Sequence, residues 1–187
     1  YDFVVCADQV GINGYLYFTD GMNYFRQFLM HPDCYGQCAY LWENQLLMDH
    51  YLGYGLASAT QNIQRLSEAL ITITERSALR TDTDLWGLTK AYVDDFVGFA
   101  PSKYRAWVSY HALLRTANRL GTVFSETKYM EPAQVGKVIG FILNLRDRTV
   151  HIPDDKLEKA RARLRKILSS DAVVPKLVER LLGTLQW

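Results

Sequence analysis

The sequence has 187 residues, of which 49% are hydrophobic and 22% are charged, and its formal net charge is +1. This length and apolar content suit one domain with a proper core and exclude an intrinsically disordered chain. The near balance of charge excludes a uniformly basic protein, so any nucleic-acid partner must bind a local patch.

No apolar run is long enough to cross a bilayer and no secretion leader opens the chain, so we expect a soluble protein with no membrane partner. An odd number of cysteines, three, predicts a reducing intracellular compartment without a disulfide framework, whether cytoplasm, nucleus or organelle. The chain begins at Tyr1 rather than at a methionine, which leaves open that it is a segment of a longer protein.

The first predicted strand ends at a carboxylate. Residues 1–13 show no clear period, whereas the aromatic run 15–19 predicts a strand that ends at Asp20 and leads into a helix over residues 21–29. Asp20 has two interpretations: a carboxylate delivered to a site at a strand end, or the N-cap of the helix, worth about 1 kcal/mol. On its position alone, the cap is favoured.

Residues 31–33 are expected to end that helix, and two apolar runs separated by polar residues predict a hairpin over residues 38–51. His31, Cys34 and Cys38 suggest zinc. The fourth ligand is missing and the spacing is unusual, so structural zinc is disfavoured.

Two long helices are predicted from apolar periodicity. The first spans residues 59–79, after a small-residue turn and before a polar loop at residues 81–84. Its core-facing residues are expected to be Ile63, Leu66, Leu70 and Ile73. The second spans residues 102–120 and is closed by Gly121. Its buried residues are expected to be Tyr104, Trp107, Val108, His111, Leu114 and Leu120.

The most informative stretch is residues 91–99, where apolar residues run up to Asp94-Asp95 and resume at once. This pattern predicts two buried strands joined by a tight turn with both aspartates at its tip. Adjacent carboxylates repel each other and are costly to desolvate, so the pair indicates a site for Mg2+ or Mn2+. The alternative is a solvated turn, the commoner use of two acids at a hairpin tip.

Near the end of the chain, β-like runs at residues 138–143 and 149–152 predict another hairpin. Asp154-Asp155 are expected to cap a basic helix over residues 156–168, and a last helix begins at about residue 174.

The predicted elements indicate an α+β fold, with an antiparallel sheet that carries helices on one face. In such a sheet Asp20, at a strand end, can converge with Asp94 and Asp95 at a neighbouring hairpin tip. Three carboxylates in one place favour a metal site over a solvated turn.

The sequence resembles reverse transcriptases in five blocks that occur in the order of that family. Tyr92-Val93-Asp94-Asp95 is similar to the Tyr-x-Asp-Asp signature. Residues 20–33, with Phe25 and Gln27, resemble the first catalytic block of retrotransposon enzymes. Residues 52–65 resemble the block usually written Leu-Pro-Phe-Gly-Leu-x-Ser-Ala-Pro, followed by Phe-Gln-Arg.

Two further blocks lie downstream. Lys128 with Glu131-Pro132 resembles the lysine block, and Ile139-Gly140-Phe141 resembles the primer-grip hairpin. Ile152-Pro153, Lys156 and residues 182–185 are similar to the start of the thumb in the tyrosine-recombinase type of retrotransposon.

The resemblance implies a polymerase palm with a ferredoxin-like core over residues 1–153 and the start of a helical thumb over residues 154–187. It implies an RNA-directed DNA polymerase, a nucleotidyltransferase that adds deoxynucleoside triphosphates to a DNA primer on an RNA or DNA template. Two Mg2+ or Mn2+ ions would be held by Asp20 and Asp94, with Asp95 in support. Lys128 would face the leaving phosphate, although a solvated lysine is its plain alternative.

The resemblance also implies a substrate-binding set. Phe25 would stack under the deoxyribose and exclude a 2′-OH, unless it is simply a core aromatic. The other members of the set are Tyr54, Gly55, Gln64 and Tyr92. The hairpin at Ile139, Gly140 and Phe141 would hold the primer, and basic residues of the helix over 156–168 would contact phosphates, unless they only form a solvated face.

Several features depart from the family. Gly53 and Thr60 stand where prolines are usual, and Ile63 replaces a phenylalanine. Few residues precede Asp20, where the family carries a fingers segment, so fingers or other subunits are expected as partners. The alternative is an inactive palm that serves as a structural or interaction module in a larger assembly. The intact carboxylates favour the enzyme, since a scaffold has no physical reason to keep three repelling charges together.

Overall fold

The computed structural model describes residues 2–78, 87–169 and 175–185, so the loop predicted at residues 81–84 lies outside the described residues. The helices are α1 (Asp2–Val10), η1 (Tyr24–Gln27), η2 (Pro32–Cys38), α2 (Ala59–Ala78), α3 (Lys103–Arg119), α4 (Asp154–Leu168) and α5 (Pro175–Leu185), where η marks a 3-10 helix. The strands are β1 (Tyr15–Gly21), β2 (Ala39–Trp42), β3 (Gln45–Met48), β4 (Leu88–Tyr92), β5 (Asp95–Ala100), β6 (Phe124–Ala133), β7 (Val135–Val138), β8 (Phe141–Asn144) and β9 (Thr149–His151). The predicted α+β class is confirmed.

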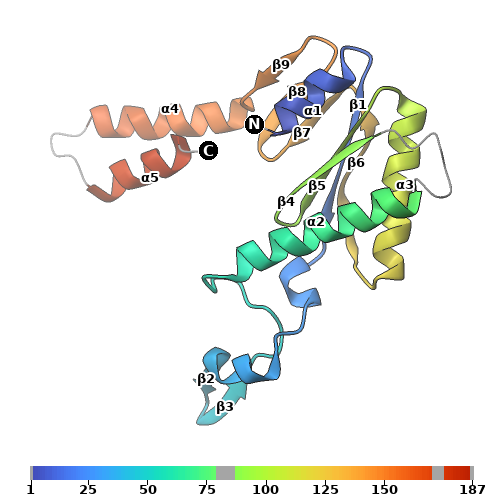
Figure 1. Cartoon of the computed structure of the whole chain (residues 1–187). Coiled ribbons are helices and arrows are strands. Elements are labelled where there is room, and N and C mark those ends of the chain that lie inside the picture. The colour runs from blue at the N-terminus through green and yellow to red at the C-terminus, as the bar shows by residue number, and fades with distance from the viewer. Residues whose placement is uncertain (1, 79–86, 170–174, 186–187) are drawn as a thin grey trace.

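The centre of the molecule is a four-stranded antiparallel sheet in the order β4-β5-β1-β6 (Figure 1). Helix α2 lies between β1 and β4 in the sequence, and α3 joins β5 to β6. This βαββαβ order with β1 and β5 at the centre is the ferredoxin-like arrangement. The hairpin predicted around the aspartates is β4 and β5.

Side chains alternate between the two faces of this sheet, so each face packs on a different layer. On one face, Tyr17 and Phe96 are fully buried against Ile63 of α2 and Leu113 of α3. Helices α2 and α3 therefore cover one face, as predicted.

The other face packs on α1 and on a separate three-stranded sheet of β7, β8 and β9. Leu16 and Phe99 of the central sheet meet Cys6 of α1 and Val138 of β7 in this second core. The sequence did not reveal this layer, because residues 1–13 were predicted to be irregular. The short helix α1 buries only Cys6 and Val10, too few positions to establish a period.

The helix predicted over residues 21–29 is wrong. Strand β1 continues through Gly21, and Asn23 adopts a left-handed conformation with φ of 48°, which leaves only the single 3-10 turn η1. His31 was expected to end a helix, but its side chain instead accepts a hydrogen bond from the Asp33 amide and caps η2.

On both long helices some of the large residues that were predicted to be buried are exposed, and small residues are buried instead. On α2, Ile63 and Leu70 are buried, but Leu66 and Ile73 are 39% and 41% exposed. On α3, Tyr104 and Leu120 are exposed, and His111 lies on the surface as well. The residues that α3 buries are Ala106, Ser109, Tyr110, Ala112, Leu113, Thr116 and Ala117. Most of these side chains are small and let the helix approach the sheet closely, and Tyr110 is the one aromatic residue among them.

The strands after α3 also differ from expectation. The run predicted at residues 138–143 is divided by a turn at Ile139 and Gly140, whose φ angles are 45° and 79°, into β7 and β8. The predicted pairing of the next two strands is confirmed as β8 and β9. Asp154 and Asp155 do not cap α4 from outside but lie in its first turn, which they stabilise through the helix dipole.

The β2–β3 hairpin, predicted from the sequence, projects away from the central sheet (Figure 1). Its exposed apolar side chains occupy consecutive positions and therefore lie on both faces; they are Tyr40, Leu41, Trp42, Leu46, Leu47 and Met48. The sequence holds no lysine or arginine between Arg26 and Arg65. Helices α4 and α5 pack on each other, and this pair also extends away from the central sheet (Figure 1). Among the described residues, no helix combines the length and apolar character needed to span a membrane.

Candidate active site

The three predicted carboxylates come together at one end of the central sheet. Asp20 of β1 lies directly opposite Asp95 of β5 in the antiparallel register. Val93 and Asp94 form the two-residue turn between Tyr92 and Asp95, so only one of the two aspartates is at the tip. The N-cap interpretation of Asp20 is wrong, because this residue lies within β1.

Burial and neighbouring carboxylates raise the pKa of both Asp94 and Asp95. Burial, followed by the charges of Asp94 and Asp20, raises the pKa of Asp95 to about 7, and a hydrogen bond with Asp20 adds to the rise. Burial and then the charge of Asp20 also raise the pKa of Asp94. The Lys128 ammonium lowers both pKa values but is the smallest of the causes. The site therefore holds more negative charge than its own residues neutralise.

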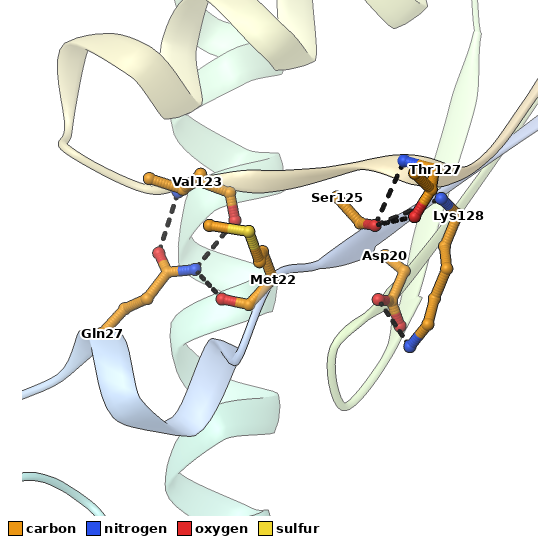
Figure 2. A network of polar contacts seen from close by, with 7 residues as sticks. All are labelled: Asp20, Met22, Gln27, Val123, Ser125, Thr127 and Lys128. Carbon is orange, nitrogen blue, oxygen red and sulfur yellow. Dashed lines mark hydrogen bonds and ion pairs between the residues drawn. The ribbon is translucent and has the colours of Figure 1, made fainter.

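Among the described residues, Lys128 is the cationic side chain that forms an ion pair with one of the three carboxylates. Its Nζ lies 3.3 Å from Asp20 Oδ2, and its side chain is 69% exposed, against 13% for Asp20 (Figure 2). This position follows from an irregularity in β6: Thr19 pairs with Tyr129, but Gly21 pairs with Phe124. The extra residues of β6 therefore bulge opposite Asp20.

The bulge is stabilised by one serine. Ser125 Oγ accepts hydrogen bonds from the amides of Thr127 and Lys128, at 3.4 and 3.1 Å (Figure 2). The sequence pointed to Lys128 only through its family resemblance, and nothing in it indicated the role of Ser125.

Gln27 fixes the segment that follows Asp20. Its Nε2 donates to the carbonyls of Met22 and Val123, at 2.6 and 2.8 Å, and its Oε1 accepts from the Val123 amide at 2.8 Å (Figure 2). One side chain thus ties η1 to the start of β6. The sequence pointed to Gln27 only as a member of the resembling block, and the structure shows its role.

The predicted substrate residues fall into two groups. Phe25 is buried, and its ring lies 4.7 Å from that of the exposed Tyr54, so these two are brought together. Gly55 has a φ of 85° with open space where a Cβ would stand, so its conformation rather than crowding requires glycine. Phe25 also belongs to the core cluster, which agrees with its alternative role as a core aromatic.

Tyr92 and Gln64 border an open groove of about 700 Å3 beside the aspartate turn. The groove is lined by Asp2, Phe3, Ala57, Thr60, Gln61, Gln64, Ala91, Tyr92 and Val93. The Gln64 amide is hydrogen bonded to the backbone of the turn itself. Ile139, Gly140 and Phe141 lie in the separate three-stranded sheet, at the β7–β8 turn and the start of β8.

The donor set suits a hard divalent cation, since carboxylate oxygens are the ligands that Mg2+ and Mn2+ prefer. Over residues 2–78, 87–169 and 175–185, no three His, Cys, Asp or Glu side chains are arranged as a ready-made metal cluster. Asp20 nevertheless lies close enough to raise the pKa of both Asp94 and Asp95, and the charge of Asp94 adds to the rise at Asp95. The chemistry of the residues therefore fits a metal, and the side chains would adjust to it.

The raised pKa of Asp95 predicts a pH-dependent site. Between its ordinary value of 3.8 and about 7, folded Asp95 keeps a proton that the unfolded chain has lost. The metal-free protein should therefore lose stability as pH rises through this range, and Mn2+ should bind more tightly towards pH 8. Thermal unfolding at pH 5.5 and pH 8, with and without Mn2+, measures both effects. Asp95→Asn should remove the contribution of this group, and an unchanged pH profile in that variant would contradict the assignment.

Comparison with known proteins identifies the fold. No family model matches the sequence, and no curated protein matches it significantly. The structure, however, is similar to those of reverse transcriptases and telomerase, so the chain has a reverse-transcriptase-like fold.

Three solved structures illustrate the likeness. The foamy viral protease-reverse transcriptase in complex with double-stranded DNA aligns with a TM-score of 0.69 and 14% identity, covering 92% of this chain and 27% of that one. The same viral enzyme with an RNA/DNA hybrid gives 0.65 and 14%, covering 91% and 20%. Apo telomerase from Candida tropicalis gives 0.55 and 9%, covering 81% and 39%. The chain thus spans well under half the length of these proteins.

Proposed function

We propose that this chain is the palm, with the start of the thumb, of an RNA-directed DNA polymerase of retrotransposon type. The observation that carries the proposal is the position of Asp20 opposite Asp95, with Asp94 in the adjoining turn. A fold shared with polymerases would not by itself place three repelling carboxylates at one end of a sheet. A two-metal nucleotidyltransferase needs that arrangement.

The carboxylates would act as metal ligands, Asp20 and Asp94 bridging and Asp95 supporting. Two Mg2+ ions held there would activate the primer 3′-OH and stabilise the leaving pyrophosphate. Lys128, which is exposed on the edge strand β6, would exchange its ion pair with Asp20 for the triphosphate. It would then supply a positive charge or a proton to the leaving group.

The remaining residues would position substrates. Phe25, supported by Tyr54, would lie under the sugar, and Gly55 would allow the nucleotide to approach the backbone. Tyr92 would face the template–primer duplex from the groove beside the turn. The turn at Ile139, Gly140 and Phe141 would grip the primer. Residues 1–153 would form the palm and residues 154–187 the first part of the thumb.

Basic residues of α4 would contact backbone phosphates, because Lys159, Arg161 and Arg165 are exposed. Neighbouring structures include a complex with double-stranded DNA and one with an RNA/DNA hybrid, which supports a nucleic-acid partner. A fingers segment would have to complete the triphosphate site.

The test is extension of a labelled DNA primer on an RNA template with Mg2+ or Mn2+, with template–primer binding recorded in the same samples. We expect extension that depends on the metal, or binding without extension that becomes extension when a fingers segment is supplied. Neither binding nor extension under any of these conditions would contradict the proposal and favour an inactive palm used as an interaction module.

A further inference from the structure

The turn that carries Asp94 is strained. Val93 has a φ of 60°, in the left-handed region, and it is followed by a residue of ordinary negative φ. A two-residue hairpin turn of this kind normally places glycine at its first position, because the left-handed conformation crowds a side chain. A β-branched residue is among the least tolerant there. Something outside the turn must therefore hold it.

Helix α2 supplies those contacts. The Val93 amide donates to Gln64 Oε1 at 2.7 Å, and Ser67 Oγ donates to the Val93 carbonyl at 2.5 Å. Gln64 Nε2 also donates to the Ala91 carbonyl at 3.1 Å, two residues earlier. Both backbone polar groups of Val93 are thus bound by side chains one turn apart on a single helix.

The two α2 side chains are themselves fixed. Glu68 Oε1 accepts a second hydrogen bond from Gln64 Nε2 at 2.9 Å, which sets the direction of the amide. Ser67 is fully buried, and because its hydroxyl proton is given to the Val93 carbonyl, its oxygen is left to accept a hydrogen bond from the Tyr24 hydroxyl. These partners leave Gln64 and Ser67 little freedom to release the turn.

The far side of the turn is attached to β1. The Gly21 amide donates to the Asp94 carbonyl at 2.9 Å, immediately after Asp20. The backbone of Asp94 is therefore held between the strand that carries Asp20 and the helix that holds Val93. Small changes in either contact would move the Asp94 carboxylate relative to Asp20.

We propose that Gln64 and Ser67 are positioning residues, which hold the strained Val93 turn so that Asp94 and Asp20 face a common metal ion. This inference rests on the proposed function and deepens it, since it names what aligns the two metal-binding blocks. It also revises the expected role of Gln64, whose amide oxygen and nitrogen are both engaged with the turn rather than directed at a nucleotide.

The experiment measures Mn2+ binding to the chain by electron paramagnetic resonance, in the absence of nucleic acid. Gln64→Leu and Ser67→Ala should each weaken binding about tenfold, because the turn would relax from its strained form in most molecules. Asn62→Leu removes an amide from the exposed part of the same helix and should leave the affinity unchanged. Circular dichroism confirms that each variant is folded.

The decisive measurement is a rescue. Glycine tolerates the left-handed conformation, so Val93→Gly in the Gln64→Leu background should restore most of the lost Mn2+ affinity. A residue that merely binds substrate would not be rescued by a change in the turn. Unchanged affinity in Gln64→Leu and Ser67→Ala, or no rescue by Val93→Gly, would overturn the positioning role.

Asp94→Asn separates this proposal from the one on which it rests. If the wild-type chain binds Mn2+ and Asp94→Asn abolishes that binding, the metal site stands whatever the α2 variants do. If the wild-type chain binds no Mn2+, or binds it equally well with Asp94→Asn, the metal site fails and the positioning role fails with it.

Discussion

Replacing Asp94 by asparagine is expected to reduce primer extension by a factor on the order of 1,000 or more, because it would remove a carboxylate that we propose as a ligand of both metal ions. Asparagine keeps the shape of the side chain and one oxygen but loses the charge that attracts the cation. Steady-state extension assays with saturating Mg2+ measure the loss. Asp20→Asn should have an effect of similar size, since the two carboxylates would hold the same ions.

The folding of this variant provides a control. Asp94 is one of three coupled carboxylates whose repulsion costs stability in the absence of metal, so Asp94→Asn should unfold at the same temperature as the wild type or higher. Asp8→Asn, which removes an exposed partner of a 3.9 Å ion pair with Arg148, should leave extension unchanged. An Asp94→Asn protein that is folded and still extends primers would show that this carboxylate is not a metal ligand.

Replacing Gly98 by alanine is expected to destabilise the protein by about 3 kcal/mol, since the site is overpacked in a rigid core. Gly98 of β5 lies opposite Tyr17 of β1, and an added Cβ would clash with Cζ, Cε1 and the hydroxyl oxygen of the tyrosine. The ring has no room to move, because the Tyr17 hydroxyl is held by Thr89 Oγ1 and Ser109 Oγ, each at 3.0 Å.

Thermal unfolding measures this effect, and a decrease of about 10 °C in Tm is expected for a domain of this size. Gly36→Ala is the matched control, because a Cβ there would meet nothing within 4 Å. Combining Gly98→Ala with Tyr17→Leu should recover part of the loss by making space for the new methyl group. A Gly98→Ala protein as stable as wild type would mean that β1 and β5 are not packed as described.

The β4–β5 hairpin shows what the sequence can predict. Its signal is local: two apolar runs of strand-forming residues stand on either side of a pair of charges that no core would accept. The convergence of Asp20 with this hairpin followed from the expected antiparallel sheet, and the structure confirms that Asp20 faces Asp95.

Strand β6 and helices α1 and α3 depend on information that is not local. Strand β6 is an edge strand, and its first half alternates small and charged residues over Ser125-Glu126-Thr127-Lys128, so its sequence lacks the apolar pattern of a buried strand. Helix α1 is too short to establish a period, and the burial of α3 through alanine, serine and threonine is invisible to a rule that looks for large apolar residues.

The sequence also gives no indication of which side chains align the site. Gln27, Gln64 and Ser67 are polar residues of the kind that usually faces water, and only the tertiary structure shows that each satisfies backbone groups of a distant segment. Such residues form hydrogen bonds with the main chain of a distant segment, so their roles cannot be predicted from composition or periodicity.

The β2–β3 hairpin has a practical consequence for handling the protein. Two short strands with apolar side chains on both faces and unpaired outer edges are a template for self-association. Trypsin cuts only after lysine and arginine, so it cannot trim the hairpin between Arg26 and Arg65. Purification of the isolated chain should therefore rely on low concentration or mild detergent, and light scattering should be checked before any loss of activity is attributed to the active site.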